Sequence, residues 1–137
     1  MIQGRPAARV AGRLFLWCDE VFMSDSLAIE ISTAEAAAVL RGTPPSAALL
    51  LLDCRTPEEH ATAKIAGALL LPMQELPERI AELSAWKEQP IIVHCHHGMR
   101  SLRVAKWLRE QGFSLAQSMQ GGIDAWSTDV DPTVLRY

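Results

Sequence analysis

An uninterrupted apolar run limits what this chain can fold into more than any other part of its sequence. Residues 47–52 read Ala-Ala-Leu-Leu-Leu-Leu, and Asp53 ends the run. A half-exposed strand would alternate apolar and polar residues, whereas a run without alternation is typical of a strand buried on both faces of a parallel sheet. Because both faces of such a sheet must be covered, the run predicts helices packed on either side of it.

Four other short apolar segments alternate with stretches that carry helix signals. Ser32 with Glu35 and Thr56 with Glu59 have the spacing of capping boxes, and Pro57 suits a first helical position. This alternation predicts one α/β domain with a five-stranded parallel sheet and helices on both faces. We expect strands at 27–31, 47–52, 68–71, 91–94 and 115–119, and helices at 33–40, 57–63, 75–86, 102–109 and 123–126.

The length of 137 residues suits one domain with a tail. We expect the domain at 26–128, a C-terminal tail at 129–137 that lies over the surface, and an N-terminal extension at 1–25 that is peripheral or disordered. Leu14–Cys18 is short for the apolar core of a signal peptide, and no clear cleavage site follows it. Met23 is an alternative start, which would place residues 1–22 outside the natural protein.

Composition narrows the class of protein further. A net charge of −3 argues against nucleic-acid binding, and no apolar run approaches the length of a membrane span. The chain has three cysteines, an odd number without a framework pattern, which indicates a reducing compartment. We therefore expect a cytoplasmic protein that binds neither nucleic acid nor membrane.

The segment around Cys95 carries the chemistry. Ile91–His94 reads as a strand, a loop runs from Cys95 to Arg100, and a helix follows that places Leu102, Ala105 and Leu108 on one face. Backbone N–H groups at a helix start favour an anion, and they favour the thiolate form of a cysteine placed there. Cys95 is therefore the candidate nucleophile.

The edge of the sheet adds polar groups to this site. The carboxyl ends of parallel strands lie on one edge, where ligands of α/β proteins bind. Asp53 and Arg55 follow the apolar run directly, so they are expected on the same edge as Cys95. Cys54 between them is either a small buried residue, the simpler interpretation, or a resolving thiol for Cys95.

Four motifs follow one another along the chain: Leu52–Arg55 with Pro57–His60, Ile65–Ala68, Cys95–Ser101 and Gly121–Trp126. Together they resemble those of a single-domain rhodanese, a sulfurtransferase that carries sulfur as a persulfide on one cysteine. The resemblance implies that Cys95 is the nucleophile, that the loop amides bind the persulfide, that Arg100 borders the pocket, and that Asp53 and Arg55 brace the loop. The sequence departs from the family in Lys64–Gly67, where His-Ile-Pro-Gly is usual, and in Cys54, where valine is common.

Arg100 is expected to bind an anionic donor such as thiosulfate. The active-site loop comprises His96, His97, Gly98, Met99, Arg100 and Ser101.

The histidines near Cys95 raise the question of a metal site. His94, His96 and His97 cannot all turn toward one ion without distortion, and no second group of ligands accompanies them, so no metal and no other cofactor are expected. His96 and His97 are expected at the pocket mouth, where they add partial positive charge. His94 points the other way along its strand and is expected in the core.

Three functions remain open. The leading one is a sulfurtransferase that moves sulfur from thiosulfate or a similar donor to cyanide or a thiol acceptor. The second is a sulfur-relay or interaction domain for an adenylating or sulfur-carrier protein, which the basic series Arg100, Arg103, Lys106 and Arg109 could contact. The third is a phosphatase or arsenate reductase, although related phosphatases have one residue more than the four between Cys95 and Arg100.

Overall fold

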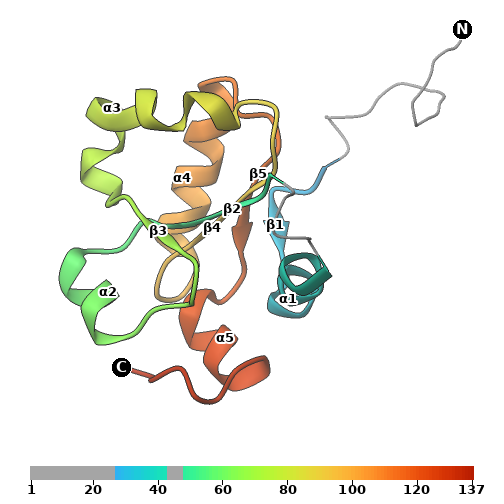
Figure 1. The fold of residues 1–137 in the computed structure, drawn as a ribbon, viewed down its shortest axis with the longest axis vertical. Coiled ribbons are helices and arrows are strands. Elements are labelled where there is room, and N and C mark those ends of the chain that lie inside the picture. The colour runs from blue at the N-terminus through green and yellow to red at the C-terminus, as the bar shows by residue number, and fades with distance from the viewer. Residues whose placement is uncertain (1–26, 43–47) are drawn as a thin grey trace, which may run out of the picture.

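A sheet of five parallel strands forms the centre of the structure, a computed structural model that describes residues 27–42 and 48–137 (Figure 1). The strand order is β1-β5-β4-β2-β3, and every neighbouring pair is parallel. The predicted fold class is confirmed. The strands are β1 (Glu30–Ile31), β2 (Leu50–Asp53), β3 (Leu69–Leu70), β4 (Ile91–His94) and β5 (Ala116–Met119).

Helices cover both faces of the sheet (Figure 1). Helices α1 and α5 pack on one face, whereas α3 and α4 pack on the other. Their bounds are α1 (Thr33–Gly42), α2 (Pro57–Thr62), α3 (Leu76–Arg79), α4 (Met99–Glu110) and α5 (Gly122–Asp129), with 3₁₀ turns η2 (Met73–Glu75) and η3 (Ile80–Trp86) beside α3.

The central strands bury both of their faces. Ile91 and Val93 of β4 pack into the core beneath α3 and α4, and Ile92 packs into the core beneath α1 and α5. All four residues of β2 are buried as well. The apolar run therefore behaves as its composition predicts, within the part of it that the structure describes.

Local sequence signals explain how two helices begin. Ser32 and Glu35 exchange hydrogen bonds of 3.1 Å at the start of α1. Thr56 and Glu59 form the second capping box, and Pro57 takes the first position of α2. Both predicted capping boxes are confirmed.

Several local predictions need correction. The first strand, predicted at 27–31, is only Glu30–Ile31. The third strand is only Leu69–Leu70, because it is the edge of the sheet and Leu69 is 45% exposed. The helix predicted at 75–86 is divided into η2, α3 and η3, although Leu83 still reaches the core. On α4, Val104 is buried and Leu102 is only half-buried, so the helix turns a slightly different face to the sheet.

The two ends of the chain compare differently with their predictions. The N-terminal extension predicted at 1–25 lies outside the described residues. The C-terminal tail does not simply lie over the surface: it returns from α5 toward α2, and Tyr137 contacts the edge of the sheet that carries Cys95 (Figure 1). Within 27–42 and 48–137, no helix combines the length and apolarity that a bilayer crossing requires.

The core prediction can be tested with two leucines that are register partners on neighbouring strands. Leu52 is fully buried in β2, and its partner Leu69 in β3 is 45% exposed. Leu52→Ala is expected to lower the free energy of unfolding by about 3 kcal/mol, because it removes buried methyl groups and leaves a cavity. Leu69→Ala is the control and should cost well under half as much in urea denaturation. Equal losses would contradict the burial described here.

Candidate active site

Cys95 lies at the carboxyl end of β4, one turn before α4 begins. Its side chain is almost completely buried, and its sulfur faces the main chain of its own loop. The N–H groups of Gly98 and Ser101 donate to Cys95 Sγ over 3.1 and 3.3 Å. Two amides thus converge on the sulfur, which is an arrangement that stabilises negative charge there.

The hydroxyl of Ser101 adds a third polar group beside the sulfur. Ser101 Oγ lies 3.5 Å from Cys95 Sγ and 2.7 Å from Ser118 Oγ. Ser101 and Ser118 are both fully buried, so their hydroxyls orient each other without water. Ser118 was not predicted as a site residue, because its polar side chain in an expected strand gave no indication of what lies across from it.

Helix α5 holds the loop from outside. The N–H groups of Ile123 and Asp124 donate to the carbonyl oxygens of Cys95 and His96 over 2.8 and 3.1 Å. Gly122 makes this approach possible, because a Cβ atom at that position would collide with both carbonyl groups. The carbonyls of the loop therefore point toward α5, which leaves amides free to point toward Cys95.

Gly98 is the second position where only glycine suits the backbone. Its φ is +104°, a conformation that L side chains rarely adopt, and a Cβ there would lie 3.1 Å from the nitrogen of Gly121. This turn is what directs the Gly98 N–H inward. The glycines of the loop and of the Gly121–Gly122 turn thus both allow the backbone of the loop to direct its N–H groups at Cys95.

Asp53 and Arg55 form a buried ion pair on the predicted edge. Arg55 Nε and Nη2 donate to the two oxygens of Asp53 over 2.8 and 2.7 Å, and both side chains are fully buried. Burial raises the pKa of Asp53, but the hydrogen bonds from Arg55 and the nearby His94 and His60 outweigh it and hold this pKa below its usual value. His60 Nδ1 lies 2.8 Å from the same carboxylate.

The bracing role predicted for this pair needs correction. In the described part of the chain, the remaining Arg55 hydrogen bonds reach Glu59 O, Ala63 O and the hydroxyl of Tyr137, not the Cys95 loop. Arg55 therefore fixes the segment that carries α2, and α2 in turn contacts the loop. The bracing is indirect.

Arg100 makes that second contact. Its Nη1 and Nη2 donate to the two carboxylate oxygens of Glu59 over 2.8 and 2.9 Å. The hydrogen bonds from Arg100 hold the pKa of Glu59 far below its usual range, against the opposing effect of burial. Glu59 was predicted only as a helix-capping residue, and it serves both roles. The bidentate pair turns Arg100 along the rim of the site while leaving other N–H groups of the guanidinium available.

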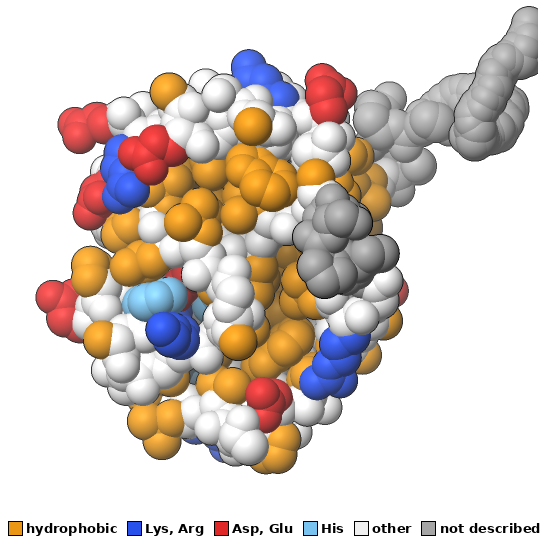
Figure 2. Space-filling model, in the orientation of Figure 1, with side chains coloured by type: hydrophobic (Ala, Val, Ile, Leu, Met, Phe, Trp, Pro, Cys, Tyr) orange, Lys and Arg blue, Asp and Glu red, His pale blue; other side chains and the backbone are white. Residues whose placement is uncertain are grey.

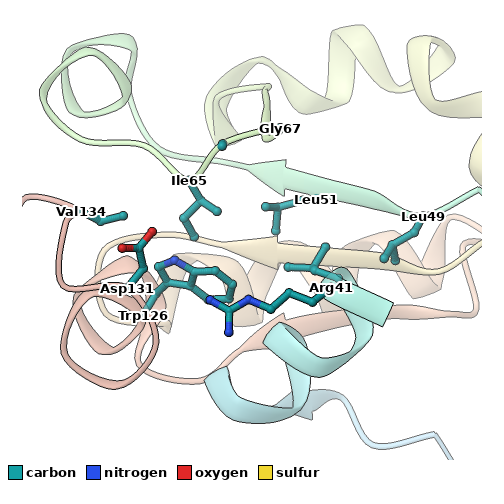
Figure 3. A pocket seen from close by; sticks show the side chains of 10 residues that line it. Arg41, Leu49, Leu51, Ile65, Gly67, Trp126, Asp131 and Val134 are labelled. Carbon is teal, nitrogen blue, oxygen red and sulfur yellow. The ribbon is translucent and has the colours of Figure 1, made fainter. Parts of the chain in front are cut away.

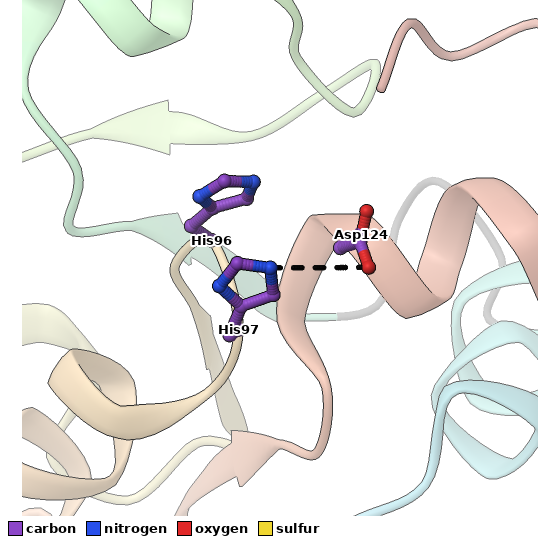
Figure 4. Close-up of side chains that lie close together, drawn as sticks. All are labelled: His96, His97 and Asp124. Carbon is purple, nitrogen blue, oxygen red and sulfur yellow. Dashed lines mark ion pairs between the residues drawn. The ribbon is translucent and has the colours of Figure 1, made fainter. Parts of the chain in front are cut away.

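His96 and His97 lie side by side directly after Cys95, and Asp124 faces them (Figure 4). Their role at a pocket mouth stays a prediction. Ligand atoms of the three residues lie within 4.8 Å of one another, so the expectation that no further ligand accompanies the histidines is wrong. Two of the three are already engaged: Asp124 pairs with Arg136, and His96 Nε2 lies 3.0 Å from the main-chain oxygen of Tyr137. That no metal binds here stays a prediction.

His94 and Cys54 belong to the core beneath the site. His94 is fully buried, and neither of its ring nitrogens has a hydrogen-bond partner among the described residues. Cys54 is 1% exposed, and burial strongly raises the pKa of its thiol. A thiol kept protonated is a poor nucleophile, which favours the structural interpretation of Cys54 over the resolving one.

A separate hollow lies apart from this chemistry. Apolar side chains line a depression on the face shown in Figure 2, and a groove of about 360 Å³ runs between α1, β2 and the tail (Figure 3). Trp126, Leu51 and Ile65 line it, with Arg41 and Asp131 as its charged groups. The groove holds no cysteine or histidine, so we place the candidate active site at Cys95 instead.

Together, fold and site define an α/β domain built around a cysteine loop that is suited to an anion. The chain belongs to the rhodanese-like domain family, whose family model matches residues 33–129.

Relatives with sulfurtransferase names and a solved rhodanese-like structure agree with this family assignment. The chain is 36% identical over 104 residues to the "Putative sulfurtransferase YtwF" of Bacillus subtilis, covering 76% of this chain and 98% of that protein. It is 38% identical over 78 residues to the "Thiosulfate sulfurtransferase GlpE" of Coxiella burnetii, covering 57% and 71%. A rhodanese-like domain protein from Staphylococcus aureus superposes with a TM-score of 0.64 at 29% identity, covering 80% of this chain and 99% of that one.

The burial of His94 predicts a pH dependence of stability. Burial lowers the pKa of His94 from 6.5 to about 4, so between these values the unfolded chain binds a proton that the folded protein does not. Stability should therefore fall by up to roughly 3 kcal/mol as the pH drops through this window, and the loss should level off below it.

The measurement is urea denaturation of the wild type and His94→Leu from pH 7 down to pH 4. The difference in slope between the two proteins isolates His94, since the rest of the sequence is common to both. Parallel curves would contradict a neutral, buried His94.

Proposed function

We propose that this protein is a sulfurtransferase that carries sulfane sulfur as a persulfide on Cys95. The single observation that carries the proposal is the pair of N–H groups, from Gly98 and Ser101, directed at a buried sulfur. A terminal persulfide sulfur is anionic near neutral pH, and oriented amides in a site shielded from water stabilise such charge. The names of the relatives from Bacillus subtilis and Coxiella burnetii support the same reaction.

The first half-reaction loads the cysteine. The Cys95 thiolate attacks the outer sulfur of thiosulfate, a new S–S bond forms, and the S–S bond of the donor breaks. Sulfite leaves with the electron pair of that bond. The partly exposed guanidinium of Arg100 lies on the rim and is suited to bind the anionic donor.

The second half-reaction removes the sulfur from Cys95. Cyanide or a thiolate attacks the terminal sulfur of the persulfide, and the S–S bond to Cys95 breaks to restore the thiolate. The enzyme alternates between two covalent states, so ping-pong kinetics are expected. Neither step needs a metal or an organic cofactor.

A protein acceptor is a second candidate for the same sulfur. Met99 is 74% exposed beside the loop, and it lines a shallow groove with Arg103 and Lys106. An exposed apolar side chain flanked by cations suits an acidic partner, such as a sulfur-carrier protein. This would make the domain one member of a sulfur relay.

The persulfide itself is the first test. Incubation with thiosulfate should add the mass of one sulfur atom to the wild type and none to Cys95→Ser, as measured by mass spectrometry of the intact protein. Cys54→Ser is the matched control and should still take up sulfur. Release of phosphate from an aryl phosphate, with no persulfide from any donor, would overturn the proposal in favour of a phosphatase.

The role of Arg100 gives a second test. Arg100→Ala should lower kcat/KM for thiosulfate by roughly ten- to a hundredfold, because it removes a charge-assisted contact to the donor. Mercaptopyruvate carries less charge near its sulfur and should suffer much less. The control is Arg103→Ala, since Arg103 is an exposed residue of the same helix. Equal losses with both donors would remove Arg100 from donor recognition.

A further inference from the structure

The C-terminal tail is tied to the domain before it reaches the site. The hydroxyl of Ser127 donates to the carbonyl oxygen of Val134 over 2.6 Å. Arg136 then pairs with Asp124, next to His97, with contacts of 2.9 and 3.3 Å. These contacts lead the chain from α5 to the rim beside α2, where Tyr137 lies (Figure 1).

The Tyr137 hydroxyl joins the side chains of two ion pairs. It accepts a hydrogen bond from Arg55 Nη1 over 2.8 Å and donates one to Glu59 Oε2 over 2.8 Å. Arg55 belongs to the buried pair with Asp53, and Glu59 belongs to the rim pair with Arg100. The hydroxyl is thus the bridge from the buried pair to the rim.

The Tyr137 ring also contacts the residue that follows the cysteine. It stacks on His96 with a centroid distance of 4.0 Å and an interplanar angle of 9°. The other face of His96 stacks on His97 at 3.9 Å. One side chain therefore touches the loop directly and, through Glu59, holds the arginine at the end of the loop.

Arg100 needs such support. A partly exposed ion pair contributes little by itself, because two long side chains lose rotamer freedom when they pair. A carboxylate that is fixed by several donors presents its oxygens in one orientation, and the pair then holds its geometry. The Glu59 carboxylate receives donors from Thr56, Arg100 and Tyr137. Arg55 of the buried pair reaches Glu59 directly only at its main-chain oxygen, so among the described contacts it is the Tyr137 hydroxyl that ties the carboxylate to that pair.

We propose that Tyr137 is a positioning residue of the Cys95 site: by fixing the Glu59 carboxylate it orients Arg100, and so sets how strongly the site attracts anionic sulfur compounds over neutral ones. The inference rests on the proposed sulfur-transfer function, whereas its test does not require turnover.

The test compares two small reagents that modify a thiolate by the same chemistry. The Cys95 thiolate attacks the thio sulfur of a methanethiosulfonate, a mixed disulfide forms, and methanesulfinate leaves. Methyl methanethiosulfonate is neutral, and its sulfonatoethyl analogue is an anion. The ratio of their second-order rate constants, followed by mass spectrometry of the intact protein, measures anion preference; the Cys95→Ser protein supplies the background from other cysteines.

Tyr137→Phe keeps the ring and removes only the hydroxyl. The anion-to-neutral ratio is expected to fall by about three- to tenfold, the equivalent of the net contribution of one ordinary hydrogen bond. Thr133→Val is the matched control, because its hydroxyl bonds Asp131 within the same tail and should leave the ratio unchanged. In a Glu59→Gln background, Tyr137→Phe should cause little further fall, since both act through one carboxylate.

Two results would overturn the inference. One is an unchanged or higher ratio in Tyr137→Phe, which includes equal changes in the rates of both reagents. The other is the same fall in the ratio with and without Glu59. Equal changes would mean that Tyr137 merely shields the cysteine. A lower ratio in a protein that forms no persulfide would support the positioning role and reject the proposed function, so the two can fail separately.

Discussion

The contact between α5 and the Cys95 loop is the constraint on which the site depends. Two N–H groups at the start of α5 bind the carbonyl oxygens of Cys95 and His96, and Gly122 lets the chains approach that closely. With those carbonyls held outward, Gly98 and Ser101 can direct their N–H groups at the sulfur. A side chain at position 122 would separate the helix from the loop, and the amides would lose their orientation.

Two ion pairs, one buried and one on the rim, lie at the edge of the sheet that carries Cys95. The inner layer is the buried pair of Asp53 and Arg55, in which Arg55 also donates to the main-chain oxygens of Glu59, within α2, and Ala63, just after it. The outer layer is the pair of Glu59 and Arg100 on the rim. Removing one partner of the inner pair would leave a buried charge uncompensated, which costs far more than a surface pair contributes. The inner pair therefore anchors this edge of the sheet, and the rim pair depends on the contacts that hold Glu59.

Much of this architecture could be predicted from local sequence. The unbroken apolar run and the two capping boxes identified the parallel sheet and two helix starts, because burial on both faces and helix capping leave short-range patterns. Cys95 and its loop were found for a similar reason: a strand, a glycine-containing turn and a helix follow one another directly. The edge position of β3 left no such pattern, since four apolar residues look alike whether or not a further strand covers them.

The parts that were missed depend on contacts between distant segments. Glu59 has the pattern of a capping residue, and nothing local indicates that Arg100 binds it from 41 residues away. Tyr137 contacts Glu59 across 78 residues, and a polar tail with one aromatic residue predicts only a surface segment. Asp124 likewise meets His97 only because the turn at Gly121–Gly122 brings α5 against the loop.

A crystal structure of the protein after reaction with thiosulfate would show whether Cys95 carries the transferred sulfur. One added sulfur atom is expected on Cys95 Sγ, surrounded by main-chain N–H groups of the loop, with Cys54 unmodified. Sulfur added elsewhere, a disulfide between Cys54 and Cys95, or an unmodified Cys95 in protein that has consumed thiosulfate would contradict that expectation.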